Sequence, residues 1–173
     1  MHEIICLFID PFLYYYQIEM KTSKLLLRLQ HDIEPYKSKV KSNPNCLDVN
    51  NKSVQCAVSR YNLQNFHEIL DLSPDEVSGD VDVEKLHDLE NRVEGYFELH
   101  GPVDEEFKEF IKLICIYLTF MAHKPLHPPG IEFGDGTTVY QEGDNYYCTA
   151  KKLHIDEEYG LCRCCVACVK EVI

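Results

Sequence analysis

The chain carries little positive charge for its size. Among its 173 residues, 17 are lysine or arginine and 29 are aspartate or glutamate, which gives a formal net charge of −12. A surplus of negative charge repels phosphate backbones and anionic membrane surfaces. The densest basic group, Lys37 to Lys41, holds three lysines and no interleaved aromatic residue. We therefore expect no nucleic-acid partner.

The sequence also lacks an apolar run long enough to cross a bilayer. Leu113 to Ala122 is free of charged residues but has only ten positions, whereas a membrane-spanning helix needs roughly 20. The apolar N-terminus carries Glu3 where a signal peptide has positive charge, and Asp10-Pro11 interrupts it. We expect residues 1–20 to be folded structure, and we expect neither a membrane span nor an export signal.

Familiar catalytic motifs are missing as well. The chain has no glycine-rich phosphate loop, no Gly-x-Ser-x-Gly elbow and no His-Glu-x-x-His pair. His67-Glu68 and His87-Asp88 are isolated pairs, which we interpret as solvated helix faces. The Cys-x-x-Cys step lacks the βαβ context of a thioredoxin-like redox pair. The sequence therefore names no catalytic residue and leaves open whether the protein is an enzyme.

Helical periodicity dominates the first 125 residues. Apolar residues three and four positions apart predict a helix from about Thr22 that kinks or ends at Pro35, a second around residues 58–70 and a third over residues 82–100. A fourth begins at Asp104 and becomes apolar on all sides from Leu113, as expected of a helix at the centre of a bundle. The fold class predicted here is mainly α, with a helical bundle over residues 1–125.

The character of the chain changes after Pro125. Gly-Asp-Gly and Glu-Gly-Asp-Asn turn signals separate short runs rich in valine, threonine and aromatic residues. We expect a small antiparallel β meander with strands near residues 131–133, 137–141 and 145–148. Residues 126–173 would form a zinc-ribbon-like appendage, packed on the bundle as one compact unit.

Nine cysteines are present, and four of them fall within seven residues, at positions 162, 164, 165 and 168. An odd count without an export signal argues against a disulfide framework, so we expect reduced thiols in a cytoplasmic protein. Cys6, Cys46, Cys56 and Cys115 are scattered and are expected to be ordinary packing residues.

The clustered thiols have the spacing of a metal site. Thirteen residues separate Cys148 from Cys162, and two separate Cys162 from Cys165, a pattern that lets three thiolates reach one zinc ion. The fourth ligand is either Cys168 or His127, which stands in a rigid turn before the predicted strands. With Cys168 the run also fits an iron–sulfur cluster, although the Cys-Pro continuation of the ferredoxin motif is absent. The competing interpretation is that these cysteines only pack, with Cys168 in a final helix. Cys164 lies off the two-residue spacing and is expected to point away from the site.

Several segments resemble an uncharacterised protein family of methanogenic archaea over roughly residues 103–168. They are Tyr117-Leu118-Thr119-Phe120, Lys124-Pro125-Leu126-His127-Pro128-Pro129-Gly130, Tyr146-Tyr147-Cys148 and Leu161-Cys162-Arg163-x-Cys165. The resemblance implies an archaeal cytoplasmic setting and no particular reaction. It also implies that His127, Cys148, Cys162 and Cys165 match the family pattern, whereas Cys164 and Cys168 do not. This match favours His127 as the fourth ligand and weakens the iron–sulfur interpretation, which needs Cys168.

The sequence thus predicts a structural zinc site at His127, Cys148, Cys162 and Cys165, because a short meander buries too little apolar area to be stable alone. Function would then lie in a helical surface or cleft that binds a protein or small-molecule partner. The alternative is a metal-dependent or iron–sulfur redox enzyme that uses the same cysteines.

Overall fold

The structure is a computed structural model of the chain, and it describes residues 20–41, 44–46, 48, 51–101 and 104–170. The prediction of folded structure over residues 1–20 therefore lies outside the described residues, apart from Met20. Within the described part, no helix combines the length and the apolar character that a membrane span requires.

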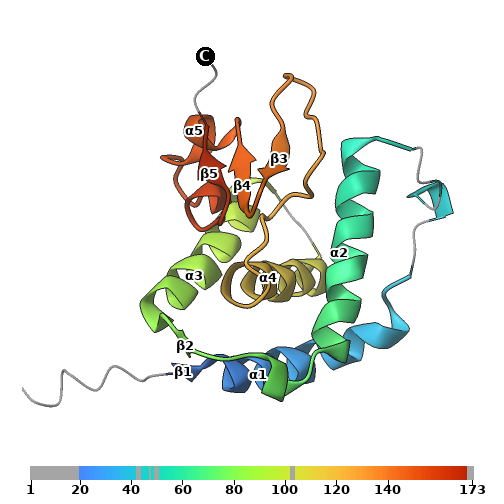
Figure 1. The fold of residues 1–173 in the computed structure, drawn as a ribbon. Coiled ribbons are helices and arrows are strands. Elements are labelled where there is room, and N and C mark those ends of the chain that lie inside the picture. Colours follow the sequence, from blue (N-terminus) through green and yellow to red (C-terminus); the bar gives the residue numbers. More distant parts are fainter. Residues whose placement is uncertain (1–19, 42–43, 47, 49–50, 102–103, 171–173) are drawn as a thin grey trace, which may run out of the picture.

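Helix α4 (Glu105–Phe120) runs through the centre of the bundle, with α1, α2 and α3 around it (Figure 1). The Asp104 carboxylate caps its first turn by accepting a hydrogen bond from the Glu106 amide at 3.1 Å. Every residue from Leu113 to Leu118 is buried, and α1, α2 and α3 all pack against this helix. The central apolar helix predicted from the sequence is confirmed.

The first helix ends where proline requires it. Helix α1 (Thr22–Ile33) gives way to the 3-10 helix η2 (Glu34–Ser38), in which Pro35 occupies the first turn. Proline has no backbone N–H and its ring clashes with the preceding turn, so the α-helix cannot continue through it. The predicted break at Pro35 is confirmed.

The other bundle elements start at side-chain caps. Helix α2 (Val54–Asp71) begins at Ser53 and α3 (Val83–Leu99) at Asp82, and each cap side chain accepts a backbone N–H of the first turn. Ser73 and Glu76 form a reciprocal capping box. The remaining short elements are η3 (Pro44–Cys46), η4 (Pro74–Glu76) and the antiparallel pair β1 (Met20–Lys21) and β2 (Asp80–Val81).

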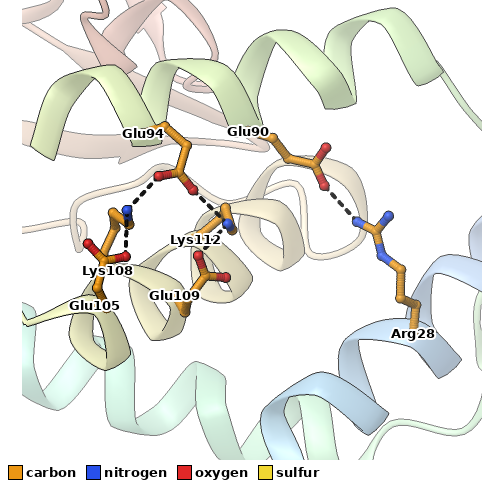
Figure 2. A network of polar contacts seen from close by, with 7 residues as sticks. All are labelled: Arg28, Glu90, Glu94, Glu105, Lys108, Glu109 and Lys112. Atoms are coloured by element: carbon orange, nitrogen blue, oxygen red, sulfur yellow. Dashed lines mark hydrogen bonds and ion pairs between the residues drawn. The ribbon is translucent and has the colours of Figure 1, made fainter. Parts of the chain in front are cut away.

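A network of ion pairs joins α3 to α4 (Figure 2). The Glu94 carboxylate lies 2.7 Å from Nζ of Lys108 and 2.8 Å from Nζ of Lys112. Glu105 and Glu109 contact the same two lysines from α4 itself. The central carboxylate thus bridges two cations one helical turn apart, which fixes the relative position of the two helices.

The C-terminal lobe, residues 126–170, contains a mixed sheet. Strands β3 (Val139–Glu142) and β4 (Asn145–Cys148) form an antiparallel hairpin, and β5 (Cys168–Val169) pairs in parallel with β4. The antiparallel meander predicted from the sequence is confirmed for β3 and β4 but not for its first strand, residues 131–133, where Glu132 forms only an isolated antiparallel bridge with Thr138. The third strand of the sheet is instead the parallel β5, which was not predicted. A parallel neighbour needs a long crossover, which α5 (Lys151–His154) and η5 (Leu161–Arg163) provide. The same crossover explains why Cys168 lies in a strand and not in a final helix.

Buried side chains gather in two clusters. The larger lies in the bundle, and the smaller, in the lobe, consists of Ile131, Val139, Cys148, Ala150 and Ala167. The described chain is thus mainly helical with small C-terminal strands, as predicted. The division into units 1–125 and 126–173 stays a prediction.

The lobe docks on α3 through a helical glycine. A Cβ at Gly95 would overlap the ring of Tyr159, which lies directly on the helix backbone. Tyr159 itself has a positive φ of 57°, an unusual conformation for a residue with a side chain. The absence of a side chain at Gly95 is therefore what permits this close contact.

One cysteine pair departs from the expectation of reduced thiols. Cys46 and Cys56 form a disulfide with a Cα–Cα distance of 4.9 Å, joining η3 to the first turn of α2. The Arg60 guanidinium holds the same loop by donating to the carbonyl oxygens of Cys46, at 3.0 Å, and Asn51, at 2.9 Å. The sequence did not indicate this bond, because pairing depends on how the loop folds back onto the helix.

Candidate functional site

A cavity of about 550 Å³ lies between the bundle and the C-terminal lobe. We call it the interlobe cavity. Apolar side chains form much of its wall: Val58 of α2, Phe97 of α3, Ile111, Ile114, Cys115 and Leu118 of α4, and Phe133, Val139 and Ala150 of the lobe. The cavity therefore borders both hydrophobic clusters.

All four predicted metal ligands line this cavity. His127 follows the turn after α4, Cys148 ends β4, and Cys162 and Cys165 lie in and just after η5. The competing ligand, Cys168, is exposed on β5 and is not among the residues that line the cavity. The fold thus brings together three separate segments that the sequence grouped by residue type and spacing.

Contacts with the backbone fix the positions of Cys148 and Cys165. Cys148 is 7% exposed and lies opposite Val139 in the β3–β4 ladder. Sγ of Cys165 accepts a hydrogen bond from the Leu126 amide at 3.4 Å. Backbone N–H groups that point at sulfur stabilise negative charge there, so this contact suits a thiolate.

Cys164 has different surroundings. It packs against the bundle cluster, and its Sγ lies 3.6 Å from Oδ2 of Asp88 on α3. Burial, reinforced by that carboxylate, raises the pKa of the Cys164 thiol to about 11. These contacts turn Cys164 toward α3 while Cys165 faces the cavity.

His127 is held in a largely apolar environment. Its ring packs edge-on against Phe133, with ring centroids 5.2 Å apart. Burial lowers the pKa of His127 below its ordinary value, so the imidazole is neutral at neutral pH. A neutral imidazole is the form that binds metal ions.

The turn that carries His127 is anchored to α2. Lys124 Nζ lies 2.7 Å from the Glu68 carboxylate, and Tyr117 Oη donates to the same oxygen at 3.1 Å. Tyr61 Oη donates to the Pro125 carbonyl at 2.9 Å in a buried contact. The interpretation of Glu68 as part of a solvated face was wrong, because Glu68 is a half-buried link between α2 and the site.

Lys151 is a buried cation beside the thiols that the sequence did not indicate. It lines the cavity, is 9% exposed, and donates to the carbonyl oxygens of Cys165 at 2.7 Å and Ala167 at 2.8 Å. Among the described residues, no carboxylate forms an ion pair with it. A buried ammonium without a counter-charge is costly, so negative charge is expected nearby.

Two cysteines on the cavity wall have raised pKa values. Burial, together with neighbouring Cys165 and Cys148, raises the pKa of Cys162 to about 11. Burial raises the pKa of Cys115, on the α4 wall, to about 12. Cys115 was expected only to pack, and its place on the cavity wall could have been inferred from its position between Ile111 and Leu118 on one helix.

The side-chain geometry does not form a metal site as it stands. Over the ranges that the structure describes, no group of three or more histidine, cysteine, aspartate or glutamate side chains is placed so that it could hold a metal ion. The structure therefore brings the four predicted ligands to one cavity without showing a metal site. Zinc and the iron–sulfur alternative both stay predictions.

Comparison with known proteins gives a consistent set of relatives. A family profile described as "Uncharacterized protein conserved in archaea (DUF2115)" matches residues 21–169. The UPF0305 protein MJ0646 of Methanocaldococcus jannaschii is 38% identical over 111 residues, which are 64% of this chain and 67% of that protein. A UPF0305 protein of Methanothermobacter thermautotrophicus is 31% identical over 113 residues, 64% of this chain and 69% of the relative. No solved structure shows a significant match. The resemblance to proteins of methanogenic archaea is confirmed.

Proposed function

We propose a metal-binding function for this chain, which belongs to the archaeal family DUF2115. Cys148, Cys162 and Cys165, with His127 as fourth ligand, hold one zinc ion and thereby tie the C-terminal lobe to the turn after α4. The observation that carries the proposal is that these four side chains, from three separate segments, line one cavity.

The donor set suits zinc. Three thiolates and a neutral imidazole make a closed tetrahedral site of the structural type. His127 is already in its neutral form, and the Leu126 amide already donates to Cys165 Sγ. Because the side chains do not form a site as they stand, binding requires them to rotate toward one another and the thiols to release their protons.

The charge of such a site also accounts for Lys151. A zinc ion with three thiolates and a neutral imidazole carries a net negative charge. The buried Lys151 ammonium, bonded to the Cys165 carbonyl, provides the opposite charge without occupying a ligand position. The negative charge of the proposed site would thus balance the buried positive charge of Lys151.

Zinc in this position is structural. The lobe's sheet consists of two four-residue strands and one two-residue strand, and so small a sheet is at most marginally stable alone. A closed zinc site contributes folding free energy directly. The partner-binding role and the cytoplasmic location predicted from the sequence remain part of the proposal.

An iron–sulfur redox centre is less well supported. That alternative needs Cys168 as the fourth sulfur ligand, and Cys168 is exposed on β5. The surroundings of the cavity therefore favour His127.

The ligand assignment is tested by single substitutions. His127→Ala should lower zinc affinity by about 10-fold or more, measured by competition with a chromophoric chelator under reducing conditions. Cys168→Ser is the matched comparison for the fourth position, and Cys164→Ser controls for removal of a neighbouring thiol; both should leave the affinity unchanged. A large loss with Cys168→Ser and none with His127→Ala would contradict the assignment.

A further inference from the structure

We propose that the interlobe cavity binds a neutral, largely apolar small molecule against its helical wall. This site goes beyond the zinc proposal, because α2, α3 and α4 supply apolar wall residues that are not among the proposed metal ligands.

Residues of both hydrophobic clusters line the cavity. Ile114 and Leu118 belong to the bundle cluster, and Val139 and Ala150 belong to the lobe cluster. All four line the cavity, so each cluster presents apolar atoms to an open volume. Apolar walls do not hold ordered water, and unfilled space forfeits dispersion contacts. A molecule that restores those contacts is therefore stabilised there.

The size of the cavity suits a ligand larger than a solvent molecule. Its volume is about 550 Å³, within the range of roughly 300–1,000 Å³ typical of small-molecule sites. Such sites commonly lie between two parts of a fold, as this one does.

Charged side chains that line the cavity already form hydrogen bonds or ion pairs within the protein. Asp135 accepts hydrogen bonds from the Thr137 amide at 2.9 Å and the Thr137 hydroxyl at 2.6 Å. His154 lies 2.7 Å from Glu157, and Lys151 donates to two carbonyl oxygens. A charged ligand would have to compete with these contacts, whereas a neutral apolar one leaves them intact. For Lys151 the inference rests on the proposed zinc site, whose negative charge supplies the counter-charge of the ammonium. With that charge in place, the cavity favours a neutral occupant.

The test uses two fluorescent probes with nearly the same aromatic body. N-phenyl-1-naphthylamine is neutral, and 1-anilinonaphthalene-8-sulfonate carries an added anionic group. Titration of the full chain should show saturable binding of the neutral probe at a single site and weaker binding of the anionic one. No fluorescence increase with the neutral probe, or tighter binding of the anionic probe, would overturn the proposal.

Cavity-filling variants locate the site. Val58→Phe on α2 and Ile111→Phe on α4 should each weaken binding of the neutral probe by about 10-fold or more, since they occupy its volume. Leu27→Phe, at an α1 position that is 55% exposed, should have no effect. Helicity, thermal unfolding and zinc content are checked for each variant. Unchanged binding in both folded filling variants would contradict the site.

Discussion

The amide of Leu126 donates a hydrogen bond to Sγ of Cys165 at 3.4 Å, across 39 positions of the sequence. This contact joins the turn after α4 to the turn that carries the C-terminal thiols. The first turn is fixed in place by Lys124 and Pro125, which contact Glu68 and Tyr61 of α2. The geometry of the candidate site therefore depends on side chains of a helix that supplies none of the predicted metal ligands.

Glu68→Gln should weaken this anchor. It removes the charge that holds Lys124 while leaving a side chain of similar shape, and we expect a loss of about 1–2 kcal/mol in the free energy of unfolding. Zinc affinity should fall with it, because the turn carrying His127 becomes less well positioned. Chemical denaturation and chelator competition measure the two effects.

The same substitution should change the pH dependence of stability. Burial alone would raise the pKa of the Glu68 carboxyl, but hydrogen bonds from Lys124, Gln64 and Tyr117 outweigh it, and the pKa lies below the ordinary value. A pKa lowered by folding stabilises the protein at neutral pH, and this contribution is lost as the pH falls from the ordinary value through the folded one. Glu68→Gln should flatten the acid limb, whereas Glu98→Gln, at an exposed position of α3, should not. An unaltered acid limb in the Glu68 variant would be inconsistent with this anchor.

Gly95→Ala should destabilise the protein although alanine is the better helix former. The added Cβ would overlap the Tyr159 ring, and overpacking of this kind costs about 1–3 kcal/mol, more than the roughly 1 kcal/mol that helix propensity returns. In a Tyr159→Ala background the same change should become neutral or stabilising. Thermal and urea unfolding of the four combinations test the contact, and destabilisation of equal size in both backgrounds would argue against it.

Glu94→Gln should loosen the contact between α3 and α4. Hydrogen bonds from Lys108 and then Lys112 lower the pKa of Glu94, so its contribution is present at neutral pH and is lost on acidification. The side chain is 35% exposed, and screening by solvent limits the expected loss to about 0.5–1 kcal/mol at low salt, less at high salt. Glu105→Gln, which removes the outer partner of Lys108 at 79% exposure, is the control. A loss that does not vary with salt would point to packing instead of charge.

Local signals in the sequence were sufficient to predict the helices of the bundle. Pro35, the helix start at Asp104 and the apolar run from Leu113 act on neighbouring residues, so their consequences could be predicted without knowledge of the whole fold. The parallel strand β5 could not be predicted, because Cys168 and Val169 reach β4 only through a crossover whose path the sequence does not encode locally. The Cys46–Cys56 disulfide was missed because its formation depends on how the loop before α2 folds back onto that helix.

The candidate ligands could be predicted from the sequence, but the residues that surround and support them could not. Spacing grouped Cys162 with Cys165, and the family resemblance favoured His127 over Cys168 as the fourth ligand. All three of the favoured residues line the cavity. Lys151 and Glu68 carry no local signal, since a lysine or glutamate in a polar stretch is usually solvated. Their burial depends on contacts made across the fold.

Metal analysis of the full chain purified without oxygen, combined with a visible spectrum, tests the zinc site most directly. We expect about one zinc ion per chain and no visible absorbance, with zinc lost from a Cys148→Ser variant, as a closed structural site requires. Iron and sulfide with broad visible absorbance, or a folded chain that contains no zinc and takes up none when it is supplied, would contradict the proposal.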